Sequence, residues 1–187
     1  MNKELPEELV SAMEVLLDHI IPEQERDSEH YTGTPKRFIQ MLLDMTTPEE
    51  FNFTTFPSTH DEMIVVSPIP FYSLCAHHIV PFFGEAHVAY IPQDKIAGLS
   101  KLARTVKSFS KGLWTQEDLT FAVAQHLEEQ LDPVGVAVVM RAEHLCMTMR
   151  GVQSPGSKTT TSIMRGAFLN PKKKARDEFF RLINGGK

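Results

Sequence analysis

The stretch "EMIVVSPIPFYSLCAHHIVPFFGEAHVAYIP", residues 62–92, carries the strongest structural signal in the sequence. Its first ten residues are rich in β-branched and aromatic side chains, and their prolines are typical of strand ends or an edge strand. "GEAHVAYIP", residues 84–92, predicts a second strand. Between them lies "CAHH", which places Cys75, His77 and His78 in an apolar run. The pattern predicts an antiparallel hairpin whose turn carries side chains able to bind a metal.

Upstream of this hairpin the sequence predicts helices. Apolar residues recur at helical spacing over residues 5–20. Thr34 followed by Pro35 predicts a second helix, because threonine caps helix N-termini and proline is tolerated at the first helical position. Residues 46–61 lack a periodic pattern, and we expect them to form a loop.

Downstream, pairs of helices and strands follow. Residues 99–110 return to helical spacing, and Thr115 with Asp118 three residues later resembles a capping box that opens a helix to about Leu131. Strands are predicted over residues 134–144, 146–152 (separate or as one bent strand) and 157–169, and a last helix over about 171–183. This order predicts an α+β fold of antiparallel hairpins with helices packed on one sheet face.

The composition is that of a soluble globular protein. The chain has 187 residues, 42% apolar and 23% charged, which suits a single domain with a sizeable core. We expect one domain over residues 1–187, with a helical part over 1–45 and the core over 60–187. The net charge of −5 argues against broad nucleic-acid binding, and no apolar run approaches the roughly 20 residues that span a membrane. Two cysteines make no disulfide framework, so we expect a reducing, cytoplasmic compartment.

The cysteines and histidines form two complementary segments. Cys75 and His78 have a spacing that lets both point into one metal site from a turn. If residues 144–150 form a strand, His144 and Cys146 share one face with Thr148 and Arg150. Two thiolates and one imidazole suit zinc, and three protein ligands leave a position for water. His77 and His144 would then lie beside the metal as proton-transfer groups.

A simpler interpretation exists for each of these residues. Free cysteines are commonly buried apolar groups, and the histidines would then be hydrogen-bonded core or surface side chains. A disulfide between Cys75 and Cys146 is disfavoured by the expected compartment. The second segment, His-x-Cys, favours the metal site because its ligand types complement those of the first.

Two further segments suggest binding of a charged purine. The helix in "GLSKLARTVKSFSKG" carries a basic stripe: Lys101, Arg104, Lys107 and Lys111. Such a stripe is commonly a solvated face, but near the helix start Ser100, backbone N–H groups and two cations could hold phosphates. In "TQEDLT", the helix dipole alone explains Glu117. Its carboxylate could also accept two N–H bonds from one edge of a guanine ring.

Six segments together resemble the GTP cyclohydrolase I family, which opens GTP to make dihydroneopterin triphosphate and formate. They are "TPKRF", "CAHHIVPFFGEAHVAYIP", "GLSKLARTV", "TQEDLT", "AEHLCMTMRGV" and "TTTSIMRGAF", in family order from about residue 34 to 168. The resemblance implies a T-fold, in which hairpins from several subunits build a barrel. It also implies a homodecamer of two pentamers, with active sites at subunit interfaces and GTP as substrate.

The resemblance also implies roles for particular residues. The zinc ligands fall on Cys75, His78 and Cys146. Proton-transfer or other catalytic positions fall on His77, His144 and Ser100. Substrate-binding positions fall on Gln116, Glu117, Lys101, Arg104, Arg150 and Arg37, of which Gln116 and Glu117 match the pair that contacts guanine.

The sequence departs from the family at "LWTQEDLT", where Trp114 and Thr115 replace Gln-Val and Asp118 replaces an arginine. Two rival functions remain. A T-fold nitrile reductase would use a nucleophilic cysteine and NADPH, whereas both cysteines here lie in the zinc-ligand segments. A non-catalytic zinc protein or pterin-binding module would have no need of proton-transfer groups beside a three-ligand metal.

Overall fold

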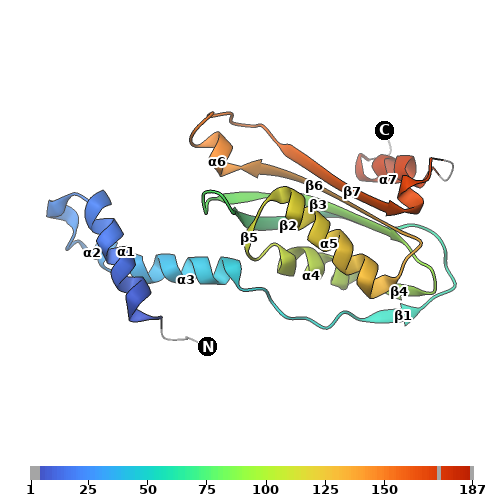
Figure 1. Ribbon diagram of the computed structural model, residues 1–187, viewed down its shortest axis with the longest axis horizontal. Coiled ribbons are helices and arrows are strands. Elements are labelled where there is room, and N and C mark those ends of the chain that lie inside the picture. The colour runs from blue at the N-terminus through green and yellow to red at the C-terminus, as the bar shows by residue number, and fades with distance from the viewer. Residues whose placement is uncertain (1–4, 172–173, 186–187) are drawn as a thin grey trace. The chain divides into compact units, whose positions relative to one another are not determined.

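The computed structural model describes residues 5–171 and 174–185, and the chain divides into two compact units at Thr47/Pro48. Figure 1 shows the order of elements, helical at first and then built around a sheet. Among the described residues, no helix combines the length and apolarity that a membrane span requires.

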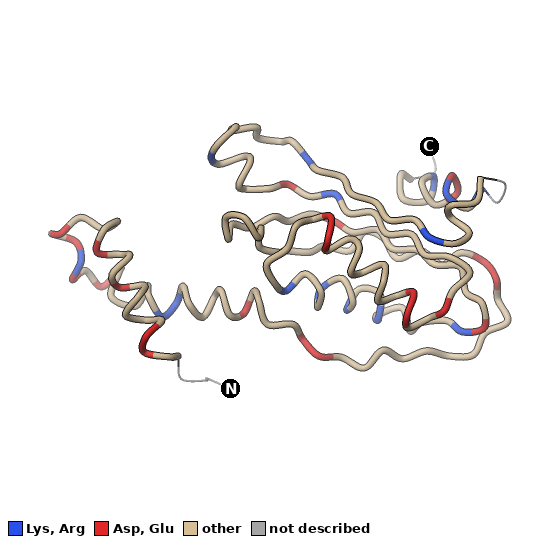
Figure 2. Tube along the Cα trace, in the orientation of Figure 1, with Lys and Arg blue, Asp and Glu red and all other residues tan. Residues whose placement is uncertain are grey.

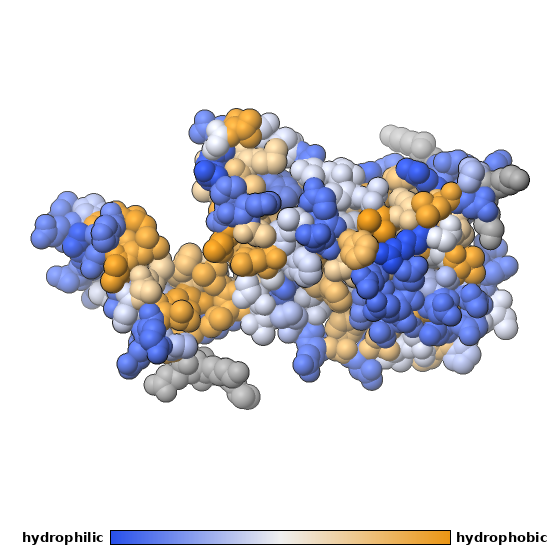
Figure 3. All heavy atoms as spheres, in the orientation of Figure 1, coloured by the Kyte–Doolittle hydropathy of each residue, from blue (hydrophilic) through white to orange (hydrophobic). Residues whose placement is uncertain are grey.

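The N-terminal unit is entirely helical. It contains α1 (Glu7–Ile20), η1 (Glu23–Glu25), α2 (Glu29–Thr32) and α3 (Thr34–Thr46). The prediction that Thr34 caps α3 was wrong: Gly33 is the N-cap, and Thr34 and Pro35 lie in the first turn. The helical pattern did predict both long helices. Their apolar side chains nevertheless stay largely exposed (Figure 3): Leu9, Val15, Leu16, Ile20, Phe38, Met41 and Leu43.

A five-stranded sheet forms the second unit, in the order β5–β2–β3–β6–β7. The strands are β2 (Ile64–Cys75), β3 (Pro81–Ile91), β5 (Leu113–Trp114), β6 (Gly135–His144) and β7 (Thr159–Gly166). All neighbours are antiparallel except β2 and β5, which form a short parallel pair. The predicted hairpin of β2 and β3 is therefore confirmed as the centre of the fold.

A second, two-stranded sheet lies inside a segment expected to be a loop. β1 (Thr55–Pro57) pairs antiparallel with β4 (Lys95–Ala97). The prediction of a loop throughout 46–61 was wrong here, because strand pairing with a distant segment gives these residues a partner that local pattern cannot show.

Helices cover the two sheet faces unequally. α4 (Leu99–Phe109) and α5 (Gln116–Leu131) pack on one face and bury the larger core, as predicted. α7 (Ala175–Ile183) and η2 (Ala167–Leu169) cover part of the opposite face with a smaller apolar cluster. The last helix was predicted over about residues 171–183, and it begins later, at Ala175. Residues 172–173 of that prediction lie outside the described part of the chain. The α+β prediction is confirmed, with α7 as the exception to a single helical face.

The strand predicted over residues 146–152 was wrong. α6 (Leu145–Thr148), a single helical turn, follows β6 directly, and turns continue to residue 152. β6 pairs with β3 only as far as the His144–Phe82 register pair, and β3 begins at Pro81. Residues beyond His144 thus lack a neighbouring strand, and the Met149 N–H donates to the Leu145 carbonyl instead (3.0 Å). Cys146 consequently does not share a strand face with His144.

Candidate metal centre and active site

Three potential metal ligands converge at one end of the sheet. The ligand atoms of Cys75, His78 and Cys146 all lie within 4.8 Å of one another. In a tetrahedral zinc site the bond lengths place ligand atoms about 3.5–3.8 Å apart. Small side-chain rotations would therefore bring the three onto one ion, as the sequence spacing predicted.

The turn after β2 presents two of these ligands. The Cys75 carbonyl accepts from the N–H groups of His78 (3.3 Å) and Ile79 (2.8 Å), and the Cys75 N–H donates to the Val80 carbonyl (2.9 Å). Ile79 has a φ of 54°, which a β-branched residue rarely adopts. The backbone thus closes a tight loop between β2 and β3 that leaves Cys75 buried and His78 exposed.

The third ligand comes from the helical turn after β6. Cys146 is half-buried in α6, and both cysteines are free thiols. Burial raises the pKa of the Cys146 thiol, and the neighbouring Cys75 raises it further while Arg150 opposes the shift. Two thiols this close resist joint ionisation unless a cation lies between them. The donor set therefore fits a soft divalent metal such as zinc.

His77 lies at the edge of this group. Its side chain is exposed, and its Nδ1 is 3.7 Å from the Cys75 Sγ. The rings of His77 and His78 are 6.2 Å apart and tilted. His77 therefore sits beside the candidate metal ligands without being one of them.

His144 lies two residues before Cys146, at the end of β6, and two contacts hold its ring. Its ring stacks on Phe82, its cross-strand partner, with centroids 4.7 Å apart and planes inclined by 1°. Its Nε2 lies 2.7 Å from the Gln116 Oε1. Burial lowers the pKa of His144, and the Glu117 carboxylate partly opposes this shift. The orientation of the imidazole is thus held by Phe82 on one face and by Gln116 at one edge.

Gln116 and Glu117 occupy the first turn of α5 but differ in exposure. Thr115 is the N-cap, and its Oγ1 accepts from the Asp118 N–H (3.1 Å), which confirms the predicted capping interaction. The Glu117 side chain is exposed, whereas Gln116 is 1% exposed and fully hydrogen-bonded to the protein. Only Glu117 is therefore free to meet a ligand.

The predicted phosphate-binding residues of α4 lie elsewhere. Figure 2 marks the positions of basic residues along α4 and of acidic residues on α5. α4 begins after β4, near the strand ends opposite Cys75, and ends close to β5, which pairs with Cys75 itself (Figure 1). Ser100, Lys101 and Arg104 thus lie towards the far end of the sheet. A single chain does not bring them to the Cys-His-Cys group.

The remaining two predicted arginines differ in their surroundings. Arg150 is exposed in the turn after α6, close enough to affect the Cys146 thiol. Arg37 belongs to the N-terminal unit, where it donates to the His30 carbonyl (3.0 Å) and to Thr34 Oγ1 (2.8 Å). Arg150 therefore lies near the candidate metal ligand Cys146 within the second unit.

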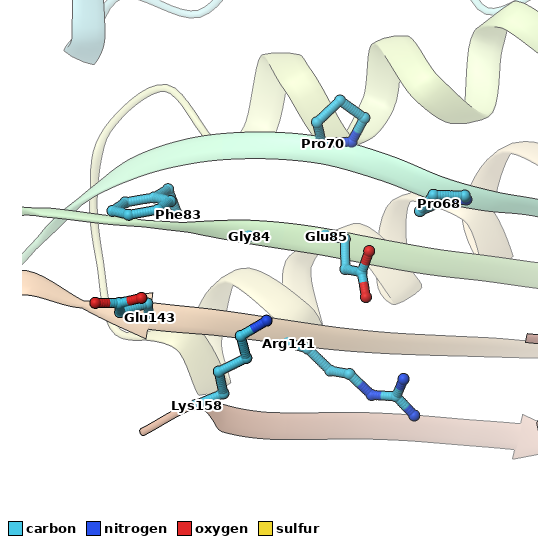
Figure 4. Close-up of a pocket in the computed structure, with 8 residues that line it drawn as sticks. All are labelled: Pro68, Pro70, Phe83, Gly84, Glu85, Arg141, Glu143 and Lys158. Carbon is cyan, nitrogen blue, oxygen red and sulfur yellow. The ribbon is translucent and has the colours of Figure 1, made fainter. Parts of the chain in front are cut away.

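A shallow pocket elsewhere on the sheet contains none of the predicted site residues. Its lining comes from β2, β3, β6 and Lys158 (Figure 4): Pro68, Pro70, Phe83, Gly84, Glu85, Arg141, Glu143 and Lys158. Glu143 and Phe83 neighbour His144 and Phe82 in sequence, so they point to the opposite sheet face. This pocket is thus separate from the candidate metal centre.

Two contributors to the site have no recognisable sequence pattern. Phe82 is one phenylalanine among several in an apolar run, and the strand register alone reveals that it faces His144. The bond between Gln116 and His144 joins residues 28 apart in sequence. Neither contact has a local sequence pattern from which it could have been predicted.

Fold and site together define an α+β protein with a Cys-His-Cys group of the type that zinc enzymes use. The profile described as GTP cyclohydrolase I matches residues 9–184. The chain belongs to the GTP cyclohydrolase I family, and its fold is therefore of the T-fold class.

The relatives are similar over nearly their whole length. A GTP cyclohydrolase 1 of Sulfurihydrogenibium sp. (strain YO3AOP1) is 50% identical over 166 residues, covering 88% of each chain. That of Aquifex aeolicus (strain VF5) is 45% identical over 181 residues, covering 96% of this chain and 97% of the relative. A solved structure of the archaeosine synthase QueF-Like in the apo form is 16% identical, with a TM-score of 0.45 over 56% of this chain and 93% of that chain.

Proposed function

We propose that the protein is a GTP cyclohydrolase I, which hydrolyses the imidazole ring of guanine in GTP. C8 leaves as formate, and the remainder rearranges and closes to 7,8-dihydroneopterin triphosphate. The convergence of Cys75, His78 and Cys146 beside His144, in a chain of this family, carries the proposal. The T-fold nitrile reductase is disfavoured, because both cysteines belong to the ligand group and neither is left as a nucleophile.

Cys75, His78 and Cys146 would hold zinc. When bound, zinc supplies Lewis-acid activation of water at neutral pH, which hydrolysis of an aromatic C–N bond requires. Three protein ligands suit this role because they leave one coordination position open. The two free cysteines also fit a reducing, cytoplasmic compartment.

His144 serves as the proton-transfer group. Its half-buried ring lies two residues before the ligand Cys146 and is oriented by Phe82 and Gln116. It would protonate a nitrogen of the purine's five-membered ring as the C8–N bond breaks. Such general-acid assistance is worth about 10²–10⁴ in rate. His77, exposed next to Cys75, and Ser100 would assist the later ribose steps.

Glu117 recognises the base. Its exposed carboxylate stands at the start of α5, near enough to His144 to affect the imidazole. Guanine offers two parallel N–H donors to one carboxylate, whereas adenine would leave it unpaired. A site built on such a match discriminates by about 10⁴ in favourable cases.

The triphosphate is bound by basic side chains from more than one subunit. Ser100, Lys101 and Arg104 lie near the start of α4, where no side chain caps the helix and the dipole favours anions. Because α4 begins away from the metal ligands of its own chain, we propose a homodecamer in which a neighbouring α4 completes each site. Arg150 and Arg37 would add further phosphate contacts.

The test uses zinc-loaded protein incubated with GTP and no NADPH. Formate and the fluorescence of the oxidised pterin product are measured, with Cys146→Ala alongside. The expected result is formate release by the wild type and its loss in the variant, together with loss of bound zinc. Intact GTP in the presence of zinc-loaded wild type would refute the proposal.

A further inference from the structure

We propose that Gln116 is a positioning residue that fixes the tautomer of His144, so that the neutral imidazole carries its proton on Nε2 and offers Nδ1 to the reaction. This inference rests on the proposed function only where it assigns Nδ1 a role in proton transfer. The tautomer itself follows from the hydrogen bonds around Gln116.

The orientation of the Gln116 amide is determined by its neighbours. Its Nε2 lies 3.1 Å from the Met140 carbonyl oxygen and 3.2 Å from that of Thr159. Carbonyl oxygens only accept hydrogen bonds, so the group facing them must be the NH₂. The flipped amide would set its own oxygen against two carbonyl oxygens in a buried site, which is strongly unfavourable.

The other end of the amide is therefore the carbonyl oxygen, and it faces His144. Oε1 lies 2.7 Å from the His144 Nε2 and can only accept. Nε2 must then carry a hydrogen. In the described part of the chain, no hydrogen bond to the His144 Nδ1 is present. Nδ1 is thus the nitrogen that carries no hydrogen in the neutral ring.

The surrounding network holds this arrangement in place. Gln116 is 1% exposed, and its Nε2 also lies 3.0 Å from Thr161 Oγ1. Thr161 Oγ1 is in turn 2.6 Å from Thr120 Oγ1. The Thr120 hydroxyl donates to the backbone carbonyl of Gln116 (2.7 Å). The stacked Phe82 ring resists rotation of the imidazole from its other side. Turning either side chain would therefore break several buried contacts at once.

This role differs from the one that the family resemblance implied for Gln116. A side chain that reads guanine needs a free polar edge, whereas both polar atoms of Gln116 are engaged within the protein. Glu117, the next residue, is exposed and retains the contact with the base. Gln116 would thus orient His144, and Glu117 would bind the substrate.

The test is ¹⁵N NMR of histidine-labelled, zinc-loaded protein by magic-angle spinning, which does not depend on particle size. Spectra are recorded above about pH 8.5, where an imidazole of ordinary pKa near 6.5 is neutral. The His144 signals are assigned by their absence from His144→Asn. We expect a protonated Nε2 and a bare Nδ1 in the wild type. A protonated Nδ1 would overturn the proposal without any variant.

Two variants test the part played by Gln116. In Gln116→Met, which keeps the length of the side chain but no hydrogen bond, we expect the neutral ring to populate both tautomers. Thr120→Val removes a buried hydroxyl from the same network without touching His144, so the Nε2–H tautomer should persist. An unchanged single tautomer in Gln116→Met would show that Gln116 does not set it.

Kinetics separates positioning from base recognition. Gln116→Met should lower kcat by about 10- to 100-fold, a loss typical of removing a partner that orients an imidazole, with KM for GTP changed less than about threefold. A raised KM with unchanged kcat would instead support direct base reading and refute the proposal. If the wild type released no formate, the proposed function would fail while the tautomer measurement still stood.

Discussion

At the scale of single residues, the site depends on how burial and neighbours alter ordinary side chains. Cys75 and Cys146 are two thiols that together favour a cation. His144 is one imidazole whose two nitrogens have different surroundings. The spacing of "CAHH" predicted the ligand turn, because Cys-x-x-His is a local pattern. The Gln116–His144 bond could not be predicted, since it depends on where a helix start meets a strand end.

Metal removal should abolish activity and be reversed by zinc. Chelation with EDTA or dipicolinate should reduce formate release by at least about 10²-fold, because activated water is lost. Zinc content per chain is measured by mass spectrometry of the metal. Restored activity on adding zinc back is the control. Full activity with zinc below a tenth of a mole per mole of chain would contradict the assigned centre.

Replacing Glu117 should weaken recognition of guanine. Glu117→Gln leaves one acceptor where two were available, so kcat/KM for GTP should fall by about 10- to 100-fold, the range for hydrogen bonds to a charged group. Steady-state fluorescence assays give the ratio. Glu129→Gln, an acid-to-amide change on an exposed residue of the same helix, is the matched control. Equal losses in both variants would exclude a specific role for Glu117.

Stability should fall as the solution is acidified, partly through His87. This imidazole is 3% exposed, and burial lowers its pKa below 6.5, with Glu85 opposing and Arg141 adding to the shift. Above pH 6.5 both folded and unfolded states hold it neutral. Below that value the unfolded state binds a proton at His87 that the folded state does not bind, so the free energy of unfolding decreases.

Urea unfolding from pH 7.5 to 5 measures this effect. We expect the decline in the wild type to approach about 1.4 kcal/mol per pH unit for each such histidine. His87→Gln should flatten the profile by one proton, whereas His60→Gln, at an exposed position, should not. A profile that stays equally steep in His87→Gln would contradict the assignment.

At the scale of elements, local periodicity predicted most helices and the central strands, whereas long-range pairing decided the remainder. α1, α4 and α5 follow their apolar spacing, and Thr115 caps α5 as its sequence indicated. β1 and α6 were missed because one depends on pairing with β4 and the other on the end of β3. The cap of α5 bears on the proposed function, since it sets the start of the helix that carries Gln116 and Glu117.

Loss of that cap should destabilise the protein and disturb the site together. Thr115→Ala removes the side-chain acceptor for the Asp118 N–H and should cost about 1 kcal/mol in unfolding free energy. Urea denaturation provides this value. Thr115→Ser, which keeps the hydroxyl, should stay within about 0.5 kcal/mol of the wild type. A loss of equal size in both variants would show that packing of the methyl group, and not capping, matters.

At the scale of the whole molecule, the proposed metal ligands and the proposed phosphate-binding residues lie apart on one chain. The metal ligands lie at one end of the sheet, and the start of α4 lies towards the other. The N-terminal helices also expose several large apolar side chains, which agrees with the proposed assembly of several subunits. Sequence periodicity predicted these helices but not the exposure of their apolar side chains, because periodicity does not show what packs against an apolar face.

Complementation between two inactive variants tests a shared site. Cys146→Ala and Arg104→Ala should each lose activity alone. When the two variants are co-expressed, they should assemble at random into rings. If each site takes Cys146 from one subunit and Arg104 from its neighbour, about a quarter of the sites should contain both intact residues. Activity near a quarter of the wild type is therefore expected. The absence of any recovery in mixed oligomers would place both parts in the same subunit.

The most direct test of the central claim follows the carbon atom that the reaction removes. GTP labelled with ¹³C at C8 is incubated with the zinc-loaded protein, without NADPH, and the products are followed by ¹³C NMR. The account predicts that the label appears in formate, in an amount equal to the GTP consumed, while the pterin product carries none. Label retained in a purine or pterin, or GTP left intact with zinc bound, would contradict it.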